Sequence, residues 1–97
     1  MKGKWQVSRD KNEPEIIEGL IRCGCSVVPL DDPRNNGLPD LLVSQNTRSG
    51  KRTVLLEVKT EKADLRPSQR DFFATWKGEV YVVRNLVEAL TIMGITK

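Results

Sequence analysis

The sequence predicts an α/β fold whose elements follow the order α-β-β-β-α-β-α within a single domain, residues 1–97. One indication is the spacing of Ile16, Ile17, Leu20 and Ile21, which places four apolar side chains on one face of a helix. Another is a series of short apolar runs that are bounded by Gly, Pro, Asn and Asp, as strands usually are. A chain of 97 residues has room for one modest core, so these elements should share it.

The first helix should begin near Asn12, because Asn is a good cap and Glu15 lies three residues later, as in a capping box. Pro14 falls in the first turn, where a missing N–H is tolerated. Gly24 is expected to end the helix. Residues 1–9 before it are interpreted as a basic arm, and residues 26–30 after it as the first strand.

The middle of the chain has the pattern of a β-hairpin. We expect a second strand over Leu41–Ser44, a polar turn over Gln45–Gly50 and a third strand over Lys51–Lys59. A loop rich in Asp and Asn, residues 31–37, precedes the hairpin, and a charged loop, residues 60–66, follows it.

A second helix is predicted over Pro67–Trp76, with Pro67 at its first position. Gln69, Phe73 and Trp76 share one helical face, so the two aromatic side chains should anchor the helix on the sheet. Gln69 would then point toward the end of the third strand, where a buried amide needs polar partners; the alternative is that it reaches solvent at the helix end.

The chain should close with a fourth strand, Val80–Arg84, and a third helix. Asn85 caps this helix in our interpretation, Glu88 completes a second capping box and Gly94 ends it.

Composition excludes several classes of protein. The chain has no His, so it can perform no Ser-His-Asp or Cys-His catalysis and can form no His-containing metal site. No apolar stretch approaches the roughly 20 residues of a membrane span, and no signal peptide follows Met1. We therefore expect a cytoplasmic protein in which Cys23 and Cys25 are buried and reduced. A net charge of +3 weakly favours a polyanionic partner.

Three polar residues of the hairpin form a candidate catalytic site: Asp40, Glu57 and Lys59. Side chains alternate along a strand, so Glu57 and Lys59 emerge on one face, and Asp40 begins the neighbouring strand. Two adjacent carboxylates repel each other, and Mg²⁺, which prefers oxygen ligands, relieves that repulsion. The backbone carbonyl of Val58 could supply a further ligand. Lys59 could hold or help deprotonate the attacking water and offset the charge of the transition state.

The order of these segments resembles the PD-(D/E)XK nuclease superfamily. The segments are a helix that begins with Asn-x-x-Glu, then Gly-x-Pro-Asp, Glu-Val-Lys and Pro-Ser-Gln. More closely, the chain resembles the virus-type replication-repair nuclease domain, VRR-NUC, in its small stand-alone form. The resemblance covers about residues 9–93.

The resemblance implies a restriction-endonuclease-like fold, with a central mixed sheet flanked by helices. It implies that Asp40 and Glu57 bind Mg²⁺, for which Mn²⁺ can substitute, and that Lys59 is the catalytic lysine. Gln69 becomes a supporting residue, although Arg66 stands where Ser or Thr is usual three positions before it. Glu15 becomes the acid of the first helix, with a role in the site or at a second metal, against its alternative role in the capping box.

The function that the resemblance implies is a metal-dependent endonuclease that hydrolyses phosphodiester bonds in branched DNA such as Holliday junctions. We expect a homodimer in a bacterial or phage-infected cell. Candidate phosphate contacts are Arg48, Lys51, Arg52, Lys62, Arg66 and Arg70. Two alternatives remain: a flap, nicking or exonucleolytic enzyme, and a non-catalytic DNA-binding module on a nuclease scaffold. The intact set of Asp40, Glu57 and Lys59 disfavours the second.

Overall fold

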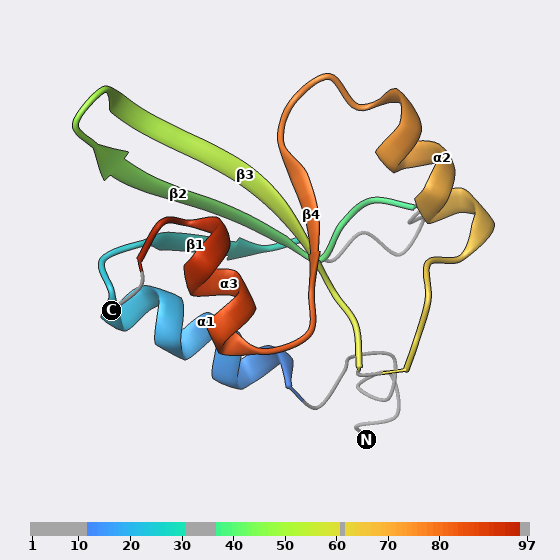
Figure 1. The fold of residues 1–97 in the computed structure, drawn as a ribbon, viewed down its shortest axis with the longest axis horizontal. Helices are drawn as coiled ribbons and strands as arrows, with labels where there is room; N and C mark the ends of the chain where they lie inside the picture. Colours follow the sequence, from blue (N-terminus) through green and yellow to red (C-terminus); the bar gives the residue numbers. More distant parts are fainter. Residues whose placement is uncertain (1–11, 31–36, 61, 96–97) are drawn as a thin grey trace.

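A computed structural model describes residues 12–30, 37–60 and 62–95. Figure 1 shows three helices around one sheet, in the predicted order. The elements are α1 (Glu13–Arg22), β1 (Ser26–Pro29), β2 (Leu41–Thr47), β3 (Gly50–Val58), α2 (Pro67–Thr75), β4 (Val80–Val83) and α3 (Leu86–Ile92). The expected basic arm, residues 1–9, and the loop residues 31–36 lie outside the described residues.

The sheet is mixed, with the strand order β1-β2-β3-β4. β1 pairs with β2 and β2 pairs with β3 in antiparallel fashion, whereas β3 and β4 are parallel. Two parallel neighbours need a crossover, and α2 lies within it. Strands β3 and β4 therefore end at the same edge of the sheet, which Lys59 and Arg84 directly follow.

The core lies between the sheet and the pair α1 and α3, which lie side by side in Figure 1, whereas α2 lies apart from them. α1 contributes Ile16 and Leu20, both fully buried, and α3 contributes Ala89. From the sheet come the alternating side chains of one face: Leu41, Val43, Val54, Leu56, Val58 and Val83. The strand alternation predicted from the sequence is thus confirmed. The predicted helical stripe is confirmed for Ile16 and Leu20, whereas Ile17 is half-buried and Ile21 is 53% exposed.

The β2–β3 hairpin is longer than predicted. β2 continues to Thr47 because Gln45 and Asn46, which were assigned to the turn, pair with Arg52 and Lys51. The Gln45 side chain also donates to the carbonyl of Met93 at 2.6 Å, which ties this end of the sheet to the end of α3. The turn itself is short, and Gly50 follows it with a φ of +120°.

The capping prediction is confirmed for α3 and wrong for α1. Asn85 accepts a bond from the N–H of Glu88, and Glu88 accepts one from the N–H of Arg84. Asn12, in contrast, has helical backbone angles and makes no side-chain capping bond, so no Asn12–Glu15 capping box forms. Its side-chain nitrogen instead donates to two strand-end carbonyls, those of Lys59 at 3.2 Å and Arg84 at 2.6 Å.

The predicted aromatic anchor of α2 is also wrong. The helix ends at Thr75, and Trp76 is 46% exposed and stacks on Phe72 with ring centroids 5.2 Å apart. Phe73 is half-buried but is not among the apolar side chains packed against the core. Of the α2 side chains, Gln69 alone is buried. The helix therefore meets the body of the protein through its first turn and not through an apolar face.

Both cysteines are free thiols, as predicted, but Cys23 is exposed whereas Cys25 is buried. Burial raises the pKa of the Cys25 thiol, and a charge on Cys23 would raise it further. None of the helices in the described part of the chain is long and apolar enough to cross a bilayer.

Candidate active site

The sheet register brings Asp40 and Glu57 together. Leu41 pairs with Leu56, so Asp40 and Glu57 lie opposite each other one step further along the same two strands. A carboxylate oxygen of Asp40, Oδ2, accepts a hydrogen bond from the N–H of Val58 at 2.8 Å. The expectation that the hairpin would place these acids at matching strand ends is confirmed.

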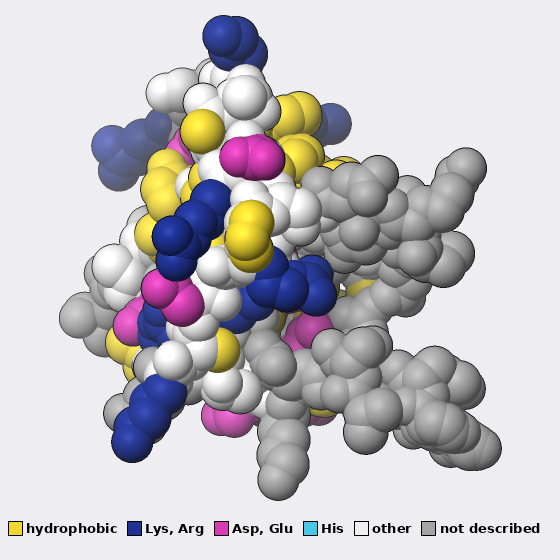
Figure 2. Space-filling view, turned by 90° about the vertical axis from the view of Figure 1, so that its right-hand side faces the viewer, with side chains coloured by type: hydrophobic (Ala, Val, Ile, Leu, Met, Phe, Trp, Pro, Cys, Tyr) yellow, Lys and Arg dark blue, Asp and Glu magenta, His cyan; other side chains and the backbone are white. Residues whose placement is uncertain are grey.

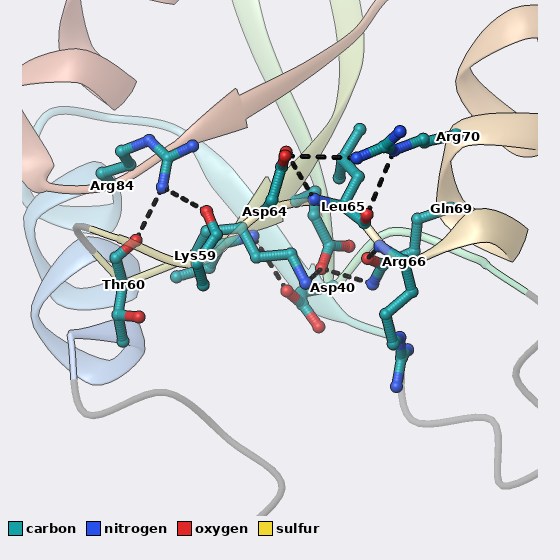
Figure 3. Close-up of polar contacts among 12 residues, drawn as sticks. Asp40, Lys59, Thr60, Asp64, Leu65, Arg66, Gln69, Arg70 and Arg84 are labelled. Atoms are coloured by element: carbon teal, nitrogen blue, oxygen red, sulfur yellow. Dashed lines mark hydrogen bonds and ion pairs between the residues drawn. The ribbon is translucent and has the colours of Figure 1, made fainter.

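The segment before Asp40 is fixed by a close approach of two backbones. Gly37 has a φ of +96°, and a Cβ atom on it would lie 2.2 Å from the carbonyl oxygen of Ser68 in α2. Only a residue without a side chain fits this position. Pro39, two residues later, is fully buried. The Gly-x-Pro-Asp segment thus docks on the first turn of α2 and places Asp40 near Gln69 (Figure 3), while the strand register places it opposite Glu57.

Glu57 is the buried centre of the site, with its side chain 4% exposed. One of its oxygens, Oε2, accepts from Gln69 Nε2 at 2.9 Å and lies 3.5 Å from Lys59 Nζ. The other, Oε1, is buried and accepts no hydrogen bond from a donor among the residues that the structure describes, although the Glu57 carboxyl group can share a proton with Asp40 when it is protonated. A buried carboxylate oxygen without a partner costs free energy, which a ligand bound there would recover.

Burial and charge both act against ionisation of Glu57. Desolvation is the larger cause and the negative charge of Asp40 adds to it, and together they raise the pKa of Glu57 from 4.5 to about 7. The nearby ammonium of Lys59, whose side chain is 12% exposed, opposes this rise without cancelling it. At neutral pH Glu57 is therefore only partly ionised, and a cation bound beside it would favour its ionised form.

Gln69 is buried at the site, as the helical spacing predicted, and its partner is Glu57. The amide has a fixed orientation because Oε1 accepts from the N–H of Arg66 at 2.8 Å, which leaves Nε2 to face the carboxylate. The bond from the N–H of Arg66 is the half of a capping box that the third helical residue supplies. Arg66 can stand in place of Ser or Thr because this bond needs only its backbone.

The donor set fits a hard divalent cation. Asp40 and Glu57 offer carboxylate oxygens, and Mg²⁺ is commonly held by one or two carboxylates with water and phosphate oxygens completing its shell. The partnerless Oε1 of Glu57 and the raised pKa of that residue are the features that a cation would relieve. Within residues 12–30, 37–60 and 62–95, no three acidic or cysteine side chains group closely enough to form a complete protein cage.

Comparison with known proteins places this site in a recognised fold. No protein-family model matches the chain, and no curated protein is similar to it in sequence. A solved structure described as a VRR_NUC domain superposes with a TM-score of 0.64 at 23% identity, and the match covers 90% of this chain and 95% of that one. The chain has the VRR-NUC fold. The resemblance drawn from the sequence is thereby confirmed at the level of architecture, including the mixed sheet flanked by helices.

In this VRR-NUC fold the structure does not bring Glu15 into the site. Glu15 is exposed, and it forms no three-acid group with Asp40 and Glu57. Glu13, two residues earlier, is the acid that α1 buries, beside Asn12. The sequence held a signal for this, since Glu13 lies on the helical face of Ile16 and Leu20, whereas Glu15 is off that face. The sequence analysis thus missed the contact of Asn12 with the Lys59 carbonyl and the burial of Glu13.

The basic candidates separate into three groups. Arg52 is engaged by Glu79, at 2.6 and 3.0 Å, and by the carbonyl of Ile92, so it holds the fold together. Arg48 and Lys51 are exposed at the hairpin tip, where Arg48 lies in the turn and Lys51 lies about 20 Å along β3 from Glu57 at the usual rise per residue. The group near the site consists of Lys62, Arg66 and Arg70, all exposed.

Figure 2 shows how charge is distributed on the face that bears α2. Basic side chains occur at several separate places, with acidic and apolar side chains between them, and they form no single continuous patch among the described residues. Arg70 illustrates this mixture, because it pairs with Asp64 at 3.2 Å on the surface. Contacts to a polyanion would therefore be distributed over several points of the surface.

Proposed function

We propose that this protein is a Mg²⁺-dependent nuclease that hydrolyses phosphodiester bonds in DNA. The single observation that carries the proposal is the surroundings of Glu57: a buried carboxylate beside Asp40, with one oxygen lacking a partner and Lys59 Nζ 3.5 Å from the other. The large majority of buried side-chain oxygens in proteins have a hydrogen-bond partner. Two acids with a lysine at this end of a VRR-NUC fold suit an oxygen-bound cation and a phosphate.

Each residue has a distinct task in this proposal. Asp40 and Glu57 hold the cation. The N–H of Val58 donates to Asp40, and the carbonyl of a strand residue points to the same side as its N–H, so the Val58 carbonyl lies on the side of β3 that faces Asp40. When bound, Mg²⁺ supplies Lewis-acid polarisation of the phosphate and lowers the pKa of water. Gln69 keeps Glu57 in place through its oriented amide. Lys59 donates toward the attacking water and the phosphate oxygens on which negative charge grows.

The finer part of the proposal concerns the substrate and the assembly. We propose branched DNA as the substrate, cut by a homodimer, because one site cleaves one strand whereas a two-fold junction needs two symmetric nicks. Large apolar side chains are more than half exposed at Ile21, Val28 and Val87, and pairing of chains is one way to cover such surface. Lys62, Arg66 and Arg70 would contact the phosphates that flank the cut.

A cleavage assay on a panel of labelled DNA tests this proposal. The panel comprises linear duplex, single strand, 5′ and 3′ flaps, nicked duplex and a four-way junction, each with Mg²⁺, Mn²⁺, Ca²⁺ or EDTA. We expect cleavage with Mg²⁺ and Mn²⁺ and binding without turnover in Ca²⁺, whose longer, looser coordination holds the reacting groups poorly. Lys77→Met is the matched control for Lys59→Met, because Lys77 is an exposed lysine that follows α2 and is not among the candidate phosphate contacts.

The outcomes separate the alternatives. Paired nicks on the junction, with light scattering at twice the 11.0 kDa chain mass, support the dimeric junction enzyme. Cleavage of flaps or single strands by a monomer would support the nuclease proposal and would replace branched DNA as its substrate. Metal-dependent DNA binding with no cleavage of any substrate indicates a non-catalytic module, and activity in EDTA refutes the role of the cation.

A further inference from the structure

The backbone N–H and carbonyl of Lys59 both form hydrogen bonds with residues other than Asp40 and Glu57. The N–H of Lys59 donates to the carbonyl of Val83 at 3.0 Å, which extends the β3–β4 pairing past the end of the strand. The carbonyl of Lys59 accepts from Asn12 Nδ2 at 3.2 Å. Both backbone groups of this residue are therefore engaged, although the strand has ended at Val58.

Arg84 engages the residues that follow. Its Nη1 atom donates to the carbonyl of Thr60 at 2.6 Å and to the carbonyl of Ala63 at 2.8 Å (Figure 3). The N–H of Ala63 also donates to the carbonyl of Thr60 at 3.2 Å, so these residues form a turn that the guanidinium closes. Arg84 thus fixes the point at which the chain leaves the sheet and turns toward α2.

The two holding side chains are joined to each other. Asn12 Nδ2 donates to the carbonyl of Arg84 at 2.6 Å as well as to that of Lys59, so one amide bridges the ends of two parallel strands. Arg84 is itself held by Glu88 of α3, which accepts from its N–H at 2.8 Å. Asn12, which precedes α1, therefore links the backbone of Lys59 to that of Arg84, which α3 holds through Glu88.

We propose that Asn12 and Arg84 are positioning residues that set the direction of the Lys59 side chain, an inference that rests on the proposed nuclease function. The ammonium of a lysine lies at the end of four rotatable bonds, so its position depends on where the backbone carries the Cα atom. A chain that leaves the sheet freely after Val58 would let Lys59 drift from Glu57. The clamp of Asn12 and Arg84 acts through backbone carbonyls, so it does not touch the reacting atoms.

Arg84 offers an informative conservative substitution. The bonds from Arg84 to the carbonyls of Thr60 and Ala63 both come from the one atom Nη1, so these two bonds do not need the fork of a guanidinium. Arg84→Lys keeps a single cationic nitrogen that can donate to both carbonyls, whereas Arg84→Met keeps the length and apolar character of the stem and removes every donor. Arg22→Met is the matched control, because Arg22 is an exposed arginine of α1 whose partner is Glu18.

The experiment measures kcat and KM on the cleaved DNA, DNA affinity in Ca²⁺ and thermal unfolding for these variants. We expect Arg84→Met to lower kcat by roughly ten- to a hundredfold with KM and DNA affinity nearly unchanged, because displacement of a catalytic group by about 1 Å has effects of that size. Arg84→Lys should recover most of the loss. If Arg84→Met fails to fold, Asn12→Leu, which removes the bridging amide, replaces it with the same expectation.

A second measurement is independent of cleavage. Amide hydrogen exchange should show the N–H of Lys59 protected in the wild-type chain and less protected in Arg84→Met, with no change in Arg22→Met. Unchanged exchange at Lys59, an unchanged kcat in a folded Arg84→Met protein, or a loss that follows DNA affinity would each overturn the positioning role. If the wild-type chain cleaves nothing, the nuclease proposal fails, while the exchange result still decides whether Arg84 holds Lys59.

Discussion

Glu79 and Glu57 both lie near the β3–β4 pair, and each faces one basic side chain. They differ in their hydrogen bonds and in their pKa values. Glu79, just before β4, accepts two bonds from the guanidinium of Arg52 and a third from the hydroxyl of Tyr81. These bonds lower the pKa of Glu79 to about 2. Glu57, at the end of β3, has one amide and a more distant ammonium, and its pKa rises to about 7.

The difference separates an end of the sheet whose charged groups satisfy one another from an end whose charged groups suit the proposed chemistry. At the Glu79 end the partners are geometrically matched and partly solvated, with side chains 28% and 40% exposed for Arg52 and Glu79. At the Glu57 end a buried acid faces another acid, and one of its oxygens lacks a partner among the described residues. A fold tolerates such a local conflict where a bound ligand resolves it.

The largest effect on cleavage is expected from substitution of Lys59, whose ammonium lies 3.5 Å from Glu57. Lys59→Met should reduce cleavage by roughly 1,000-fold, because a preorganised charge near a reacting phosphate is worth several kcal/mol. The fold and DNA affinity should be nearly unchanged, since the side chain lies beyond the strand end. Steady-state cleavage and gel-shift measurements check this, with Lys77→Met as the control. Cleavage within about tenfold of the wild type would remove Lys59 from the mechanism.

The next effect concerns the stability of the metal-free protein. The pKa of Glu57 is higher in the folded chain than the 4.5 of an exposed Glu, so the folded state binds the extra proton. Its contribution to the free energy of unfolding is therefore fully present below pH 4.5 and is lost as pH rises to about 7 and above. The loss should be on the order of 2–3 kcal/mol at pH 8.

Urea denaturation in EDTA at several pH values measures this loss. Glu57→Gln removes the titrating group and should flatten the profile between pH 5 and 8 while raising stability at the alkaline end. Added Mg²⁺ should flatten the wild-type profile in a similar way. A mutant profile that still falls as steeply as the wild type would show that another group carries the pH dependence.

The smallest effect is expected from substitution of Glu79, both of whose carboxylate oxygens accept hydrogen bonds. Glu79→Gln should cost about 1 kcal/mol of stability near neutral pH, since the pair is partly exposed and screened by solvent. The sign is opposite to that of Glu57: this contribution is present above pH 4.5 and lost as pH falls toward 2. Cleavage should remain near the wild-type level. A large loss of activity with little loss of stability would place Glu79 in the functional machinery.

The sequence predicted those parts of the site that depend on local pattern. Strand alternation and the hairpin register were enough to bring Asp40, Glu57 and Lys59 to one edge of the sheet. Helical spacing was enough to point Gln69 inward. These relations involve neighbours along one element or across one short turn, where geometry leaves little choice.

The parts that escaped prediction depend on contacts between distant segments. Asn12 has the pattern of a helix cap, yet its amide binds carbonyls 47 and 72 residues away. Arg52 has the pattern of an exposed basic residue, yet its partner Glu79 lies 27 residues further along the chain. Trp76 was expected to anchor a helix, but α2 docks through the backbone contact of Gly37 with Ser68.

The central claim is that Asp40 and Glu57 form a divalent-cation site, and calorimetric titration of the DNA-free protein with Mn²⁺ tests it most directly. Mn²⁺ favours the same oxygen ligands as Mg²⁺. The account predicts binding by the wild type, binding weaker by roughly tenfold or more in Glu57→Gln and Asp40→Asn, and wild-type binding in Glu79→Gln. Equal Mn²⁺ affinity in the wild type and Glu57→Gln, or no binding by a folded wild-type chain, would contradict it.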